Sequence, residues 1–143
     1  MKNISIKIKK LYDDVITPSY ALDGDAGLDI FSHEDVVIEP MERHIFYTGF
    51  ALEIPKGYCA LVWDKGGISM KRGLKVMGGV FEYTYRGEYT ICLLNTGNES
   101  QEFKKGDKIA QILIQPIITA NIIEVENLSE TKRGAGKWGS TGK

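Results

Sequence analysis

The stretch Ile4-Ser5-Ile6-Lys7-Ile8-Lys9 alternates one apolar residue with one polar residue. Successive side chains of a β-strand point to opposite faces, so this period of two predicts a strand with one buried face. Similar runs, rich in Ile, Val, Tyr and Phe, recur along the chain. They are Val36–Ile38, His44–Phe50, Cys59–Trp63, Tyr89–Leu94, Lys108–Ile114 and Ile117–Val125. Many short strands at this spacing predict an all-β sandwich or barrel.

Turn signals separate these runs, and a change in composition near the C-terminus marks the expected end of the domain. Four of them are Asp23-Gly24-Asp25, Pro55-Lys56-Gly57, Thr96-Gly97-Asn98 and Lys105-Gly106-Asp107. The only helix that we expect is a short one at Ile68–Arg72, after two glycines. From Ser129 onward the chain becomes rich in glycine and loses the strand pattern, as flexible ends do. We therefore predict a β domain over residues 1–128 and a flexible tail over 129–143.

Composition indicates in which cellular compartment the protein works and which classes of partner it does not bind. The 143 residues suit one domain, and the net charge of −1 gives no general field that would attract nucleic acid or an anionic membrane. The N-terminus lacks the apolar core of a signal peptide, and no apolar run approaches the ~20 residues of a spanning helix. Cys59 and Cys92 lie in strand-like runs, which predicts buried reduced thiols. His33 and His44 give zinc little support. We expect a cytoplasmic protein that binds neither nucleic acid nor a membrane.

The glycine-rich tail gives the first hint of function. It offers a cation at Arg133, a flat ring at Trp138, and hydroxyls at Ser140 and Thr141. Glycines between them leave backbone amides accessible, so the segment is suited to closing over a phosphorylated aromatic ligand. A floppy tail with an incidental tryptophan is the alternative that the tail alone leaves open.

Five segments carry side chains suited to chemistry. They are Ala26–Ile30 (AGLDI), Asp64–Ser69 (DKGGIS), Gly79–Glu88 (GVFEYTYRGE), Gly106–Gln111 (GDKIAQ) and Arg133–Gly142 (RGAGKWGSTG). In order and spacing they resemble the five motifs of the trimeric dUTPases, from about residue 26 to the C-terminus. The resemblance implies a homotrimer of jelly-roll-like β-barrels (the β-clip fold), active sites shared between subunits, and a flexible C-terminal lid.

The resemblance also implies the reaction: Mg²⁺-assisted hydrolysis of dUTP to dUMP and pyrophosphate by an activated water. Such a reaction limits uracil in DNA and supplies dUMP for thymidylate synthesis. The catalytic residues would be Glu82, at the position of the water-activating acid, and Asp29, which would meet Mg²⁺ through its water shell. The substrate would contact Lys65, Gly66, Gly67, Gly79, Val80, Tyr85, Gln111, Arg133, Trp138, Gly139, Ser140 and Thr141.

The motif residues have individual roles and structural alternatives. Gly79–Glu88 would form a β-hairpin whose backbone N–H and C=O groups hold the nucleoside. Tyr85 would pack under the deoxyribose and exclude a 2′-hydroxyl, although ordinary cross-strand packing is the alternative. Gln111 would donate to a phosphate oxygen, or else form an interface hydrogen bond. Asp29 could instead be a turn aspartate. Trp138 would stack on uracil, and Arg133 would hold the γ-phosphate. Three further charged residues of the motifs, Arg86, Glu88 and Asp107, are expected to be structural.

Two motifs depart from the family pattern. Glu82 replaces an aspartate and Phe81 a small aliphatic residue, so the carboxylate moves by about 1 Å or more, which can cost about 10²-fold. Lys65-Gly66-Gly67 replaces Arg-Ser-Gly, which removes a hydroxyl donor, and loss of such a donor costs about 10²–10³ in rate. Three hypotheses remain: an active variant with compensations, an enzyme for a modified deoxyuridine nucleotide, or a nucleotide-binding sensor with weak catalysis.

Three functions from other classes fit less well. A dCTP deaminase of similar fold would need a carboxylate in the strand Thr90–Asn95, which has none. A zinc deaminase would need an HxE and CxxC pattern, which the chain lacks. A regulatory or capsid-like scaffold would have no need for the cation, ring and hydroxyls of the tail.

Overall fold

The structure is a computed structural model of the chain, and it describes residues 4–138. Its ordered elements are eleven strands and one short helix within those residues. The elements are β1 (Lys7–Lys10), β2 (Leu28–Phe31), β3 (Val36–Ile38), β4 (Arg43–Tyr47), β5 (Phe50–Glu53), β6 (Tyr58–Trp63), α1 (Gly66–Arg72), β7 (Leu74–Met77), β8 (Val80–Phe81), β9 (Thr90–Asn95), β10 (Gln101–Phe103) and β11 (Lys108–Pro116). The all-β prediction is therefore confirmed.

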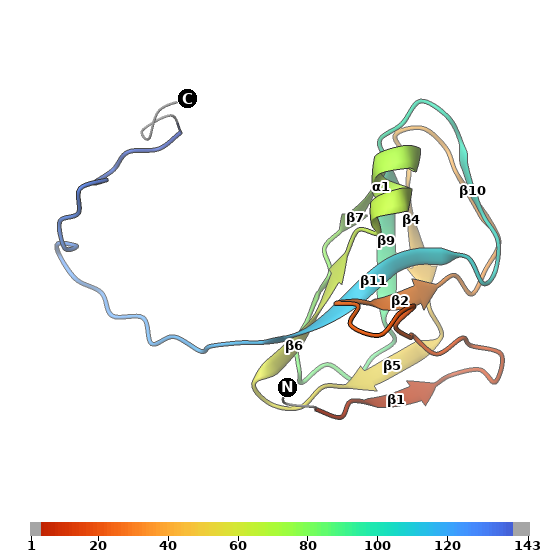
Figure 1. Cartoon of the computed structure of the whole chain (residues 1–143), viewed down its shortest axis with the longest axis horizontal. Helices are drawn as coiled ribbons and strands as arrows, with labels where there is room; N and C mark the ends of the chain where they lie inside the picture. The colour runs from red at the N-terminus through yellow and green to blue at the C-terminus, as the bar shows by residue number, and fades with distance from the viewer. Residues whose placement is uncertain (1–3, 139–143) are drawn as a thin grey trace.

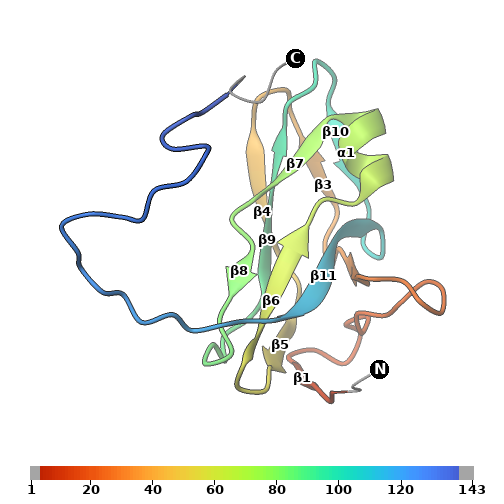
Figure 2. The ribbon, with the colours of Figure 1, turned by 60° about the vertical axis from the view of Figure 1, so that its left-hand side comes forward.

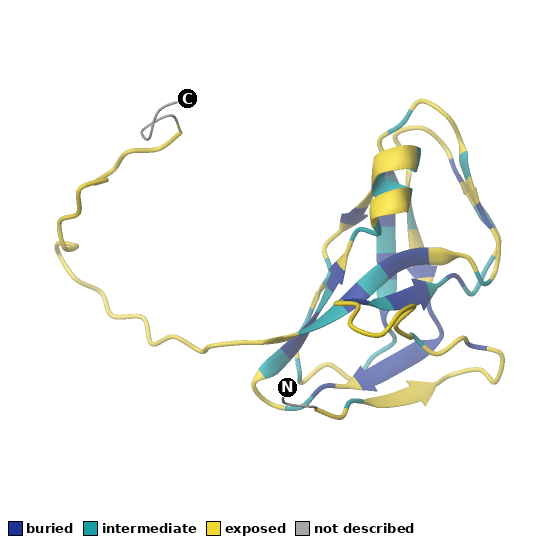
Figure 3. Cartoon of the chain, in the orientation of Figure 1, coloured by how far each residue is buried: buried dark blue, intermediate teal, exposed yellow. Residues whose placement is uncertain are grey.

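The strands form antiparallel sheets that pack around one core (Figure 1, Figure 2). The sheet orders are β1-β5, β10-β3, β2-β11-β6-β8 and β4-β9-β7. Figure 3 shows that the buried residues lie mainly in the strands, whereas the segment after β11 is exposed. In β9 the burial alternates along the strand, as a sheet with one packed face requires. Aromatic rings of Phe46, Phe50, Tyr89 and Phe103 fill much of the interior.

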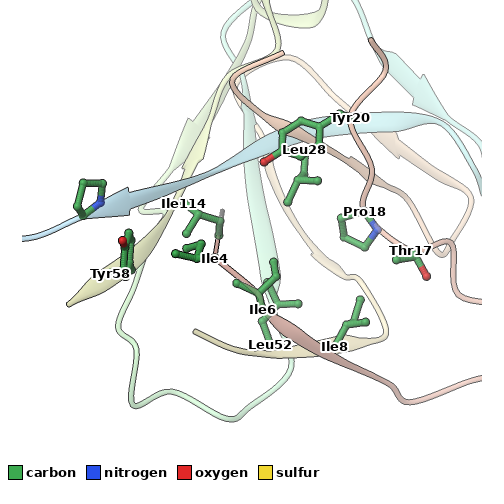
Figure 4. A pocket seen from close by; sticks show the side chains of 11 residues that line it. Ile4, Ile6, Ile8, Thr17, Pro18, Tyr20, Leu28, Leu52, Tyr58 and Ile114 are labelled. Carbon is green, nitrogen blue, oxygen red and sulfur yellow. The ribbon is translucent and has the colours of Figure 1, made fainter. Parts of the chain in front are cut away.

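The first predicted strand is only partly confirmed. Its regular part, β1, begins at Lys7, and the apolar side chains of Ile4 and Ile8 are 38% and 37% exposed rather than buried. Both line an apolar cavity of about 870 Å³, seen in Figure 4. The cavity is bounded by Ile4, Ile6, Ile8, Thr17, Pro18, Tyr20, Leu28, Leu52, Tyr58, Ile114 and Pro116. The apolar face of the strand thus opens onto a hollow that this single chain does not fill.

Three further predictions differ from the structure. The predicted hairpin at Gly79–Glu88 is wrong, because β8 pairs with β6, whereas β9 pairs with β4 and β7. The run His44–Phe50 is broken at Gly49, whose φ of +75° suits glycine, into β4 and β5. The run Ile117–Val125 forms no strand in this chain. Its backbone extends away from the sheets after Pro116 (Figure 1), because it has no neighbouring strand to pair with.

Cys59 is buried and Cys92 is half-buried, and both are free thiols. Within residues 4–138, no helix combines the length and apolar character needed to cross a membrane.

Candidate functional site

The sheet β2-β11-β6-β8 brings four of the five segments side by side. Asp29 on β2 is the register partner of Gln111 on β11, and Gln111 is in turn the partner of Trp63 on β6. Asp64 and Lys65 follow directly after Trp63. On the other side of β6, the Val62 N–H donates to the Gly79 carbonyl at 2.7 Å. Segments far apart in the sequence are therefore neighbours because antiparallel pairing places them on adjacent strands.

Asp29 lies at the centre of a charged cluster. Its residue is only 2% exposed. The Lys65 ammonium donates to Oδ1 at 2.6 Å, and Lys108 Nζ lies 2.6 Å from Oδ2. The Lys108 contact is an ion pair with an oxygen that no other donor reaches among the described residues. Burial opposes the charge of Asp29, but the contacts with Lys108 and Lys65 outweigh it and hold the pKa below its ordinary value of 3.8.

The Asp29 cluster should contribute to stability in a pH-dependent way. A carboxylate whose pKa is lowered by folding stabilises the folded state above its unfolded pKa, and that contribution is lost as the pH falls below about 3.8. Asp29→Asn is expected to lower the free energy of unfolding at pH 7 by about 1–3 kcal/mol, since it leaves two lysines without a charged partner. The partial exposure of both lysines, 30% and 42%, keeps the effect below the ~3–5 kcal/mol of a fully buried pair.

Urea unfolding of both proteins at pH 7 and pH 3 checks this expectation. The difference in free energy of unfolding between wild type and Asp29→Asn should be smaller at pH 3 than at pH 7. A variant as stable as wild type at pH 7 would show that the lysines do not depend on Asp29.

Gln111 and Asp64 fix the connection between β6 and α1. The Gln111 amide donates to the Asp64 carbonyl at 2.8 Å. The Asp64 carboxylate accepts from the Val76 N–H at 2.6 Å and pairs with Lys75. Gly27 makes room for the Gln111 side chain, because a Cβ at Gly27 would lie 2.6 Å from Gln111 Oε1. The Gln111 amide, for which we predict a phosphate contact, is thus already fixed in position by packing and by this hydrogen bond.

Gly66 and Gly67 begin α1 directly after Lys65. A Cβ at either position would meet no other atom within 4 Å. Steric crowding within the chain therefore does not explain why this motif has glycine in place of serine, because a serine side chain would fit at Gly66. Gly79 differs, since its φ is +106° and a Cβ would lie 2.7 Å from the Val62 carbonyl oxygen. Glycine is required there for β8 to approach β6 so closely.

An aromatic cluster supports the segment that carries Glu82 and Tyr85. The Phe81 ring stacks on Tyr89 with centroids 4.1 Å apart and planes inclined by 16°. Tyr89 stacks in turn on Phe50 at 5.7 Å. Tyr85 tilts against Phe81 at 5.7 Å and against Tyr89 at 5.9 Å, and its hydroxyl donates to the Glu88 carbonyl at 2.9 Å. Tyr85 packs against both rings but remains 41% exposed, so part of its side chain is accessible to a ligand.

The turn after β8 is held by backbone contacts of its own charged residues. Arg86 donates to the carbonyls of Tyr83 and Tyr85 at 2.6 and 2.9 Å. The Glu88 carboxylate accepts from the Gly49 N–H at 2.7 Å. These contacts agree with the structural role expected for both residues.

Burial shifts two groups near this turn. It raises the pKa of Tyr89 to about 12, and the Tyr89 hydroxyl has no hydrogen-bond partner in the described part of the chain. It also raises the pKa of Cys59, with a smaller contribution from the charge of Glu82. Glu82 therefore lies near Cys59, as expected from the pairing of the preceding Phe81 with Ala60.

Glu82 and Lys65 do not meet within one chain. Glu82 lies beside the Cys59 end of β6, whereas Lys65 follows the opposite end, at Trp63. Four residue steps along a strand cover about 13 Å. The structure therefore brings Asp29, Lys65 and Gln111 together but leaves Glu82 and Tyr85 apart from them. Gly79 and Val80 line a small hollow of about 140 Å³ between β6, β7 and β8.

The tail lies away from all of these residues. Residues 117–138 are exposed, and Trp138 is 99% exposed. Figure 2 shows the segment curving well clear of the sheets. Arg133 lies in this segment, and its carbonyl accepts from the Gly136 N–H at 3.0 Å. The predicted contacts at Gly139, Ser140 and Thr141 lie outside the described residues.

Lys108 belongs to the charged cluster around Asp29, and sequence reasoning missed it. Strict alternation would place residues 108 and 111 on opposite faces of β11. A register shift between Lys108 and Ala110 interrupts the alternation, which lets Lys108 reach Asp29 while Gln111 pairs with it. The basic residue in GDKIAQ was the available signal. Within residues 4–138, no group of three or more His, Cys, Asp or Glu side chains could hold a metal ion.

The fold and the cluster define an all-β protein that gathers its polar segments on one antiparallel sheet. A dUTPase family model matches residues 13–142. The chain belongs to the dUTPase family.

Individual relatives resemble the chain over nearly its full length. It is 45% identical to the deoxyuridine 5′-triphosphate nucleotidohydrolase of Nautilia profundicola, over 98% of this chain and 100% of that protein. The corresponding protein of Clostridium tetani is 43% identical, over 100% of each. Among solved structures, the dUTPase of Staphylococcus bacteriophage 80alpha with dUpNHpp is 30% identical, with a TM-score of 0.92 over 99% of this chain and 100% of that one.

A second phage structure concerns a metal. It is a D95N mutant of the dUTPase from phage phi11 of S. aureus, described as revealing the coordination of a structural Mg(II) ion. It is 28% identical to this chain, with a TM-score of 0.81 over 87% of this chain and 98% of that one.

Proposed function

We propose that this dUTPase hydrolyses dUTP to dUMP and pyrophosphate, with Glu82 as the base that activates the attacking water. Family membership supports the substrate and the reaction. The observation that carries the assignment of residues is the sheet order β2-β11-β6-β8, because it makes neighbours of four motif segments. Hydrolysis in the cytoplasm, where free thiols such as Cys59 persist, would limit uracil in DNA and supply dUMP.

The proposed mechanism divides the substrate between two groups of residues. Lys65 and Gln111 hold phosphate oxygens as a point charge and an amide donor, and the amides of Gly66 and Gly67 add further donors. Gly79, Val80 and Tyr85 hold the nucleoside. Glu82 accepts a proton from water as the water oxygen bonds to the α-phosphorus; the bond from the α-phosphorus to the oxygen bridging to the β-phosphorus breaks, and its electrons leave with pyrophosphate. Arg133, Trp138, Gly139, Ser140 and Thr141 close over the bound nucleotide.

A complete site in this proposal requires more than one subunit. Glu82 and Lys65 lie at opposite ends of β6. The tail begins beyond Pro116 and leaves its own sheets, with Ile118 and Ile122 96% and 92% exposed. Apolar side chains so exposed favour association with another chain. The unfilled apolar cavity in Figure 4 supports the same conclusion. We infer a homotrimer in which each active site takes its phosphate-binding residues, its Glu82 and its tail from different subunits.

Light scattering tests the shared site. At micromolar concentration the protein is expected to have three times the 16.0 kDa mass of one chain. Mixing two inactive variants, Glu82→Gln and Lys65→Met, gives the functional readout, because mixed trimers would contain some sites with neither change. A monomer in solution, or no recovery of activity after mixing and reassembly, would contradict sites built from several subunits.

Tyr85 is proposed to exclude ribonucleotides. Its ring is backed by Phe81 and Tyr89, so a 2′-hydroxyl against its exposed face would be crowded and would lack a partner. Tyr85→Ala is expected to reduce the preference for dUTP over UTP by about tenfold, measured as the ratio of kcat/KM values. Tyr85→Phe is the matched control, since it keeps the ring and removes only the bond to Glu88. An unchanged ratio in Tyr85→Ala would make Tyr85 a packing residue.

Mg²⁺ enters the proposal as a counter-ion of the triphosphate, since it prefers phosphate oxygens and retains much of its water. Both oxygens of Asp29 contact lysine ammonium groups at 2.6 Å, so the water shell of a metal would share these oxygens with Lys65 and Lys108. The catalytic and metal role of Asp29 remains a prediction, and no proposed step of the protein residues depends on it.

Release of pyrophosphate from dUTP, UTP, dTTP and dCTP, with and without Mg²⁺, tests the proposed function. The highest kcat/KM is expected for dUTP with Mg²⁺. Comparable hydrolysis of several bases would favour the enzyme for a modified nucleotide, and tight binding of dUTP with negligible turnover would favour the sensor.

A further inference from the structure

The charges around Asp29 do not balance. One carboxylate contacts two ammonium groups, those of Lys65 and Lys108, each at 2.6 Å. A single lysine would neutralise a single carboxylate, so the cluster carries one surplus positive charge. Lys65 and Lys108 remain 30% and 42% exposed, whereas Asp29 is 3% exposed. The negative charge is therefore buried and the surplus positive charge faces solvent.

We propose that Lys108 is a second phosphate-binding cation, which holds the pyrophosphate portion of the substrate together with Lys65. Asp29 is the fixed counter-ion that positions both ammonium groups. This inference rests on the proposed function, because it places the triphosphate at Lys65 and Gln111.

The Lys108 contact leaves hydrogen-bonding capacity free. An ammonium has three N–H donors. The ion pair with Asp29 Oδ2 engages one of them, and within residues 4–138 Lys108 has no other ionic partner. Lys104 and Lys105, in the preceding turn, instead pair with Glu102 and Asp14 at the surface. Of the lysines in GDKIAQ and the turn before it, Lys108 alone combines a buried counter-ion with free donors.

The neighbours of Lys108 match the chemistry of a polyphosphate. The register shift in β11 lets Lys108 contact Asp29 from the same strand that places Gln111 opposite Asp29. Two cations and one amide donor are thus grouped around a single backbone position of β2. Two cations can each contact a different phosphoryl group of a polyphosphate chain, which a monophosphate does not offer.

Calorimetric titration of the trimer with dUpNHpp and, separately, with dUMP tests Lys108. The two ligands share the nucleoside and differ in the phosphate chain. Lys108→Met is expected to weaken binding of dUpNHpp by about tenfold or more and binding of dUMP by less than about twofold. Lys108→Arg, which keeps the charge, should recover most of the lost affinity. Lys9→Met on the exposed face of β1 is the control for loss of one positive charge, and it should change neither titration.

Two results would overturn the inference. One is unchanged dUpNHpp binding by Lys108→Met. The other is an equal loss for both ligands, which would mark Lys108 as a structural partner of Asp29. If Lys108→Met proves unstable in thermal unfolding, the comparison of Lys108→Gln with Lys108→Arg carries the same decision. Both titrations measure binding without hydrolysis. Failure of the wild type to hydrolyse dUTP would therefore refute the proposed function, whereas the binding result for Lys108 could still be interpreted.

Discussion

Glu82→Gln is expected to remove nearly all hydrolysis of dUTP while binding of dUpNHpp survives. An amide has almost the size of the carboxylate but cannot accept a proton from the attacking water, so the loss should be about 10²–10⁴-fold in kcat. The Glu82 side chain is exposed and makes no hydrogen bond within the described residues, whereas the backbone carbonyl of Glu82 accepts from the Tyr85 N–H at 3.0 Å and is kept in Glu82→Gln, so the fold should not depend on the carboxylate. Thermal unfolding is the control. Unchanged kcat in Glu82→Gln would remove this residue from the mechanism.

Glu82→Asp gives more information, because it restores the acid that the family usually has. Phe81 stacks on Tyr89, and Tyr89 stacks in turn on Phe50. This support fixes the backbone next to Glu82. If this support is adapted to glutamate, aspartate falls short of the water by about 1 Å and kcat should drop by about 10–10²-fold. Phe81→Ile should lessen that drop, since it removes the stack. Higher activity in Glu82→Asp would instead mean that the pocket never adapted.

Gly66→Ser is the companion change. A side chain at Gly66 meets no other atom within 4 Å, so the serine hydroxyl can be added without distortion. Because positions 66 and 82 address one transition state, their effects on kcat are expected to be non-additive. Simple additivity would show that the two departures from the family pattern are independent.

Deletion of Lys132–Lys143 is expected to abolish turnover, by about 10²-fold or more, and to leave thermal stability nearly unchanged. Residues 132–138 make hydrogen bonds only with the tail itself, and Trp138 is 99% exposed. Their removal therefore takes nothing from the core, but it removes the ring and the cation proposed to close over the nucleotide. Trp138→Ala should reproduce part of the loss, and Lys137→Ala should not. Full activity in the truncated chain would refute the lid.

The strands buried in the core were the most predictable part of the fold. Val36–Ile38 matches β3 residue for residue, and Cys59–Trp63 matches β6 apart from Tyr58. These strands follow from local alternation and turn residues, which are encoded nearby in the sequence. The short helix was likewise predicted from its flanking glycines, and α1 begins two residues earlier, at Gly66.

The failures share a physical cause: they depend on pairing between distant segments. Ile117–Val125 has the composition of a strand but no partner within this chain. Residues 79–88 resemble a hairpin, yet β9 finds its partners in β4 and β7. The contact of Lys108 with Asp29 was not predicted, because strict alternation along the strand places Lys108 on the face opposite to Gln111. The register shift between Lys108 and Ala110 breaks that alternation. Local pattern cannot show which strands become neighbours or where a bulge falls.

For the candidate site, the sequence predicted which residues take part but not how they are arranged. The motifs named Asp29, Lys65 and Gln111, and the structure places all three around one pair of strands. The motifs could not show that two lysines hold Asp29, or that Glu82 lies at the far end of β6 from Lys65. These are consequences of strand order, which the sequence encodes only through the whole fold.

Phosphorus NMR of the products formed from dUTP tests the central claim most directly, with wild type and Glu82→Gln compared at equal Mg²⁺. The account predicts that wild type yields dUMP and pyrophosphate in equal amounts and that Glu82→Gln yields almost none of either. Formation of dUDP and orthophosphate, or equal rates for the two proteins, would contradict it.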